Sequence, residues 1–159
     1  MKKYYPWTLV GLLWFVALLN YMDRQMLSTM QEAMKADIAE LNRAEAFGAL
    51  MAVFLWIYGI VSPFAGIIAD HVSRKKLIVG SIFVWSAVTF LMGYAQNYQQ
   101  LYWLRALMGV SEALYIPSAL SLIADWHEGK SRSLAIGILM PGLYVGQAIG
   151  GFGATVAAI

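Results

Sequence analysis

Five long apolar segments divide the sequence, and each is long enough to cross a lipid bilayer as a helix. Such a helix needs about 20 mostly apolar residues, and stretches of this kind lie at residues 7–30, 47–69, 77–94, 101–124 and 134–159. Hydrophobic residues make up 60% of the 159 residues, and charged residues only 13%. A soluble domain of this size has too little interior to bury so much apolar surface. The sequence therefore predicts an all-α integral membrane protein.

Other classes of chain fit less well. Apolar and polar residues do not alternate at period two, so a transmembrane β-barrel is not expected. The chain has no cysteine, which rules out disulfides and thiolate metal sites. Lys2 and Lys3 precede an apolar run, but no small-residue cleavage site follows, and Asp23-Arg24 continues the segment. No cleavable signal peptide is therefore expected.

The basic residues predict which way the chain crosses the membrane. Lys35 and Arg43 lie between the first two segments, on one predicted side. The other side holds seven of the eleven basic residues: Lys2, Lys3, Arg74, Lys75, Lys76, Lys130 and Arg132. Because basic residues favour the cytoplasmic side, the N-terminus is expected in the cytoplasm, and the protein in the plasma membrane (the inner membrane of a bacterium). Residues 32–45 are expected to form a solvated outer loop with some helix.

Four charged residues lie inside the apolar segments. Asp23 and Arg24 interrupt the first segment, and Arg105 and Glu112 lie in the fourth. A charge near a bilayer centre costs roughly 2.5–3.5 kcal/mol on insertion scales, so such residues usually face a protein interior or a wet cavity. These four residues are therefore candidates for function.

Helical spacing places these charges on two faces. Asn20, Asp23 and Arg24 share one face of the first helix, and Arg105 and Glu112 share one face of the fourth. If the two helices are neighbours, both contribute charge to one region. The structural alternative is an internal ion pair that locks the helices together. For Arg105 this alternative is favoured, because it lies near the interface and could snorkel, pair with Asp23 or act in gating.

Arg24 is the better candidate for a substrate ligand, since a guanidinium offers a fork of donors that matches a carboxylate or phosphate. Glu112 and Asp23 are the candidate proton carriers. Burial favours the neutral form of a carboxyl group, while a nearby guanidinium favours the charged form. An incoming anion that takes over the guanidinium would leave the carboxylate to take up a proton, so that anion and proton cross together.

The connection after the second segment carries a recognisable signature. A helix end, an acid and a basic cluster follow one another within a short stretch, Gly66-Ile67-Ile68-Ala69-Asp70-His71-Val72-Ser73-Arg74-Lys75-Lys76. Asp70 and Arg74 are interpreted as a structural latch or gating pair, although a basic cluster alone is also a topology signal. The spacing resembles the loop signature of the major facilitator superfamily. His71 stands where that family usually has a basic residue, and Ser73 where it has Gly.

Other segments narrow the resemblance. Three stretches of the sequence resemble the anion:cation symporter family. They are Asn20-Tyr21-Met22-Asp23-Arg24 in the first segment, Tyr58 ahead of Gly66 in the second, and the run from Arg105 through Gly109 and Glu112 to Pro117 in the fourth. The spinster family, which exports lysolipids, shares much of this pattern and is the second choice. The resemblance implies the N-terminal part of a twelve-helix transporter in which the first and fourth helices line a central cavity.

Weaker candidates are polar groups that could hydrogen-bond a hydroxylated substrate: Tyr21, Tyr58, Tyr144 and Gln147. Any one Tyr is also readily explained as a packed ring or interface anchor; the resemblance favours Tyr58. In the fifth segment, Gly142, Gly146 and Gly150 form a stripe after Pro141. Such a stripe permits close helix packing, and a sliding surface is the functional alternative.

We therefore expect a truncated N-terminal domain, residues 1–159, of a major facilitator-type helix bundle, completed by a missing C-terminal half. The expected function is proton-coupled symport of a small organic anion, such as a sugar acid, by alternating access. The alternatives are a spinster-like lysolipid exporter and a non-transporting membrane interaction unit. No enzyme activity, cofactor, metal site or nucleic-acid partner is expected, because no catalytic or ligand cluster rises above chance.

Overall fold

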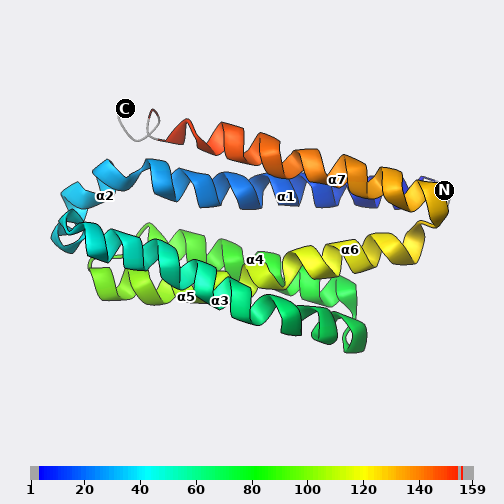
Figure 1. Cartoon of the computed structure of the whole chain (residues 1–159), viewed down its shortest axis with the longest axis horizontal. Coiled ribbons are helices and arrows are strands. Elements are labelled where there is room, and N and C mark those ends of the chain that lie inside the picture. Colours follow the sequence, from blue (N-terminus) through cyan, green and yellow to red (C-terminus); the bar gives the residue numbers. More distant parts are fainter. Residues whose placement is uncertain (1–3, 154, 156–159) are drawn as a thin grey trace. The chain divides into compact units, whose positions relative to one another are not determined.

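The described part of the chain is helical throughout, with five helices or helix pairs long and apolar enough to cross a membrane. The computed structural model describes residues 4–153 and 155. The elements are α1 (Tyr5–Thr29), α2 (Gln31–Asp37), η1 (Ala39–Asn42), α3 (Ala44–His71), α4 (Arg74–Met92), α5 (Tyr98–Ala113), α6 (Tyr115–Trp126) and α7 (Gly129–Gly150) (Figure 1). Helices suit a bilayer because they satisfy their backbone hydrogen bonds internally.

Two compact units make up the chain. One comprises Met1–Ala33 and Leu122–Ile159, and the other Met34–Ser121. In the first unit, α1 and α7 run side by side and parallel (Figure 1). In the second, α5 packs against both α3 and α4.

The α1–α7 contact depends on the glycine stripe of α7. A Cβ at Gly142 would lie 2.9 Å from the backbone oxygen of Trp14. Cβ atoms at Gly146 and Gly150 would overlap the backbone oxygens of Leu18 and Met22. The four-residue spacing on both helices brings one glycine against α1 on each turn. This confirms the packing interpretation of the stripe.

The fourth apolar segment is a pair of helices, whereas the sequence predicts one continuous helix. α5 ends at Ala113 and α6 begins at Tyr115. Pro117 lies four residues after Ala113, so it has no N–H for the Ala113 carbonyl, and its ring crowds that oxygen. The lost hydrogen bond lies at the interruption, whereas α3 and α7 continue past Pro63 and Pro141.

The segment between α1 and α3 is less solvated than predicted. It forms α2 and η1, as expected of a loop with some helix. However, Ile38 and Leu41 are buried in a cluster with Leu50 of α3 and Leu101 of α5. These apolar contacts tie η1 to the adjoining ends of α3 and α5.

The last apolar segment also differs in extent. α7 ends at Gly150, a turn follows at Gly151 and Phe152, and Gly153 is again helical, whereas the sequence predicts one uninterrupted helix. The predicted end at residue 159 lies outside the described residues. Residues 154 and 156–159 lie outside the described part of the chain. Near this end, the Thr29 hydroxyl donates a hydrogen bond to the Gly150 carbonyl oxygen at 3.2 Å, which joins the ends of α1 and α7.

Candidate functional site

In the first unit, the predicted face of α1 carries polar groups inside an apolar helix. Asn20 is 2% exposed, and its Oδ1 accepts no hydrogen bond from the residues that the structure describes. Asp23 and Arg24 are half-buried. The Arg24 guanidinium lies over the ring of Tyr21, with its Cζ atom 4.8 Å from the ring centre. The predicted substrate ligands Asn20, Tyr21 and Arg24 therefore lie within two turns of one helix.

The aromatic face contributes to holding Arg24 in place. A ring one turn earlier on the same helix presents its negative π-face to the guanidinium, an attraction worth roughly 0.5–2 kcal/mol. A guanidinium also carries N–H donors along the edge of its plane. The edge is the part that binds a carboxylate or phosphate.

Tyr144 and Gln147, the predicted ligands on α7, are exposed. They flank Gly146, whose backbone packs against α1. Their side chains therefore lie outside the α1–α7 contact, on the surface of the first unit.

In the second unit, α5 buries both of its charged residues within the apolar segment. Glu112 is 1% exposed and Arg105 3%. Arg105 does not snorkel to an interface: its Nη1 donates to the Met108 thioether sulfur at 3.2 Å, and its Cζ lies 4.5 Å from the centre of the Phe54 ring. Of the options given for Arg105, the structure supports an internal placement, and its roles in ion pairing or gating stay predictions. The apolar neighbours on α3 and α5 hold it inside the unit.

Tyr58 lies on α3, one turn after Phe54, and their rings stack at 6.0 Å with an interplanar angle of 26°. Tyr58 is half-buried and Phe54 is 2% exposed. The sequence interpretation singled out Tyr58 and Arg105 but passed over Phe54, which contacts both. Its spacing from Tyr58 was visible in the sequence, but its contact with Arg105 depends on how α3 and α5 pack.

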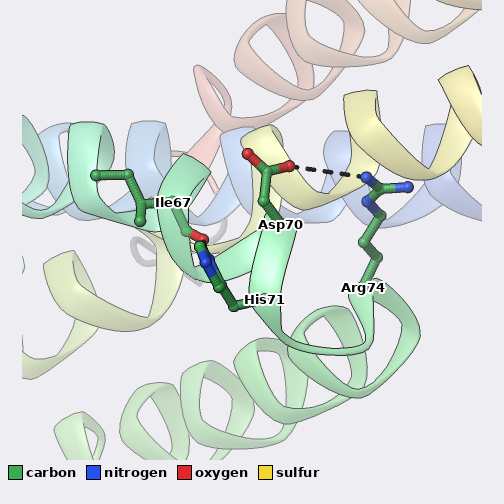
Figure 2. Close-up of polar contacts among 4 residues, drawn as sticks. All are labelled: Ile67, Asp70, His71 and Arg74. Atoms are coloured by element: carbon green, nitrogen blue, oxygen red, sulfur yellow. Dashed lines mark hydrogen bonds and ion pairs between the residues drawn. The ribbon is translucent and has the colours of Figure 1, made fainter.

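The connection between α3 and α4 carries the predicted ion pair of Asp70 and Arg74. The Arg74 Nη2 atom lies 3.7 Å from Asp70 Oδ1 across the short connection (Figure 2). The Nδ1 atom of His71 lies 2.8 Å from the Ile67 carbonyl oxygen, so the imidazole turns back onto its own helix. Asp70 is exposed, and exposed pairs contribute about 0–1 kcal/mol. The pair therefore contributes little to stability.

Comparisons with known proteins give the family. The model of the Major Facilitator Superfamily matches residues 13–158. The chain is 30% identical to the probable L-galactonate transporter of Escherichia coli over 89% of its own length. It is 31% identical to protein spinster of Drosophila melanogaster over 82% of its length. It covers 31% and 22% of those two proteins, so it spans about a third of its relatives or less.

A solved structure agrees with the fold and with the resemblance to the spinster family. A bacterial homologue of the human lysosomal transporter Spinster, in an inward-facing unoccupied conformation, superimposes with a TM-score of 0.87 at 27% identity. The match covers 99% of this chain and 33% of that one. Relatives named as anion transporters and relatives named spinster are thus both represented. From the family match, the helical fold and the five apolar segments, the chain is an integral membrane protein that belongs to the Major Facilitator Superfamily.

Proposed function

We propose that the chain is the N-terminal part of a secondary transporter that couples a small organic anion, a sugar acid or another carboxylate, to protons by alternating access. The observation that carries this proposal is the carboxyl group of Glu112, 1% exposed within a membrane-spanning segment. An ionisable group is expensive at such a place and is a functional candidate by default. The half-buried Arg24 adds a cation inside a second segment. Relatives named as L-galactonate, gallate and anion transporters support the substrate class.

Each polar residue has a proposed role. Arg24 anchors the anion through its donor fork, and Asn20, Tyr21, Tyr58, Tyr144 and Gln147 contribute hydrogen bonds to substrate hydroxyl groups. Glu112 or Asp23 carries the proton. When an anion occupies the guanidinium, the acidic group loses that partner and its neutral, protonated form is favoured. Release of the anion reverses the exchange, so that neither cargo crosses alone.

Glu112→Gln tests the coupling role. The amide keeps the size of the side chain but carries no titratable proton, so proton-driven accumulation should be lost while exchange of labelled for unlabelled anion continues. The measurement is uptake into proteoliposomes, with and without an imposed pH gradient, by the full-length transporter that contains this chain. The matched control is Glu128→Gln in the exposed α6–α7 connection. Wild-type accumulation by the Glu112 variant would show that this residue does not carry the proton.

A second candidate, export of an amphipathic anionic lipid, is favoured by the structural match to a Spinster homologue and by relatives named sphingosine-1-phosphate transporter. Uptake of labelled L-galactonate, gallate and sphingosine-1-phosphate at two pH values separates the candidates. Saturable, pH-dependent uptake of either small carboxylate supports the first proposal. Transport of the lipid alone supports the second.

A further inference from the structure

We propose that Phe54 is a positioning residue of the substrate site, which holds Tyr58 in place through a ring that is itself fixed by Arg105. The inference rests on the proposed function, in which Tyr58 contacts the substrate. The inference is argued from four residues of the second unit: Phe54 and Tyr58 on α3, and Arg105 and Gly109 on α5.

Gly109 sets the close approach of the two helices. A Cβ at this position would lie 3.0 Å from the Phe54 carbonyl oxygen and 3.2 Å from the Ile57 Cβ. These distances are tighter than ordinary van der Waals contact, so α3 lies against α5 at a point that only glycine leaves open. The backbone of Phe54 is therefore seated on α5, and the residue is only 2% exposed.

Arg105, one turn before Gly109 on α5, meets the same ring. Its guanidinium lies over the face of Phe54 with a separation of 4.5 Å, and its Nη1 donates to Met108. Arg105 and Phe54 are both almost fully buried. A cation over an aromatic face is attracted more strongly when it is desolvated than when it is exposed. This contact fixes the orientation of the ring as well as its position.

Tyr58 continues the arrangement along α3. Its ring stacks on Phe54 with an angle of only 26° between the planes, and the side chain is half-buried. Phe54 thus meets a buried cation on α5 and a partly accessible tyrosine on its own helix. Loss of the Phe54 ring would remove the aromatic surface on which the Tyr58 ring stacks, so the direction of the Tyr58 hydroxyl would be less tightly fixed.

The test uses anion uptake by the full-length transporter, with the best-transported of L-galactonate, gallate and sphingosine-1-phosphate as probe. Phe54→Leu should raise KM on the order of ten-fold, with a smaller change in kcat, because positioning of a substrate contact is lost. Phe64→Leu is the matched control: it removes an exposed ring from the same helix and should leave KM unchanged. Tyr58→Phe should also raise KM.

A double-mutant cycle distinguishes positioning from general destabilisation. If Phe54 acts through Tyr58, Phe54→Leu should change KM less than two-fold in the Tyr58→Phe background, since the hydroxyl is already absent. Full, independent effects of the two substitutions would overturn the inference, as would an unchanged KM in Phe54→Leu. If Phe54→Leu does not fold, trifluorophenylalanine can be placed at position 54, because it keeps the ring but weakens the negative face that Arg105 contacts. An unchanged KM in that variant would also overturn the inference. Absence of wild-type uptake of all three anions would overturn the proposed function and this inference together.

Discussion

Arg24 and Arg105 show two ways in which a guanidinium is accommodated within an apolar helix. Arg105 is buried between the Phe54 ring and the Met108 sulfur, partners that attract a cation without carrying charge. Arg24 lies over Tyr21 and remains half-buried. Arg24, the less buried of the two, is the proposed anchor.

Arg24→Lys tests that assignment. Lysine keeps the charge but loses the planar fork, so KM for the anion should rise by about ten-fold while some uptake remains, and Arg24→Ala should abolish uptake. The measurement is initial uptake rate against anion concentration. Arg43→Lys, at the exposed start of α3, is the control and should transport as wild type. Equal KM values for wild type and Arg24→Lys would show that no bidentate contact exists at Arg24.

Helix pairs in both units depend on glycine at the closest contacts. Gly142, Gly146 and Gly150 bring α7 onto α1, and Gly109 brings α5 onto α3. Lipid gives helices little hydrophobic reason to associate, so close packing and interhelical hydrogen bonds must stabilise these pairs. The hydrogen bond from Thr29 to Gly150 adds to the first of them.

Gly146→Ala should therefore loosen the α1–α7 pair. Its methyl group would overlap the Leu18 carbonyl, and overpacking of this kind costs about 1–3 kcal/mol. The expected result is a lower midpoint in a thermal melt of the detergent-solubilised protein followed by size-exclusion chromatography. Gly137→Ala on the same helix has open space around its Cβ and should not lower the midpoint. Equal midpoints for the two variants would mean that α7 does not depend on close contact at Gly146.

At the scale of the whole molecule, direction across the membrane can be tested with single cysteines, because the natural chain has none. The positive-inside rule predicts that the α4–α5 connection lies outside and the α3–α4 connection inside. A membrane-impermeant maleimide applied to intact cells should label Gln96→Cys, while Ser73→Cys should react only after permeabilisation; both positions are exposed. The opposite pattern would reverse the proposed orientation.

Much of the fold was accessible from the sequence because membrane spans are a local property. Each span needs only enough consecutive apolar residues, and the family signature around Asp70 and Arg74 is contiguous in the chain. The proline that interrupts the fourth segment was also visible, but its consequence was missed: spans tolerate proline, and whether the helix continues depends on its surroundings.

The sequence by itself determined the number of apolar spans, the charged residues within them and the family to which they point. Only the tertiary structure decided what those charges contact. The sequence left open whether Arg105 snorkels or pairs internally, and in the structure it packs against Phe54, where Gly109 lets α3 approach α5. The hydropathy of a span is a property of consecutive residues in one segment. The partner of a buried charge, by contrast, depends on which side chain a second helix presents. That depends on helix packing, which residues distant in the sequence determine together.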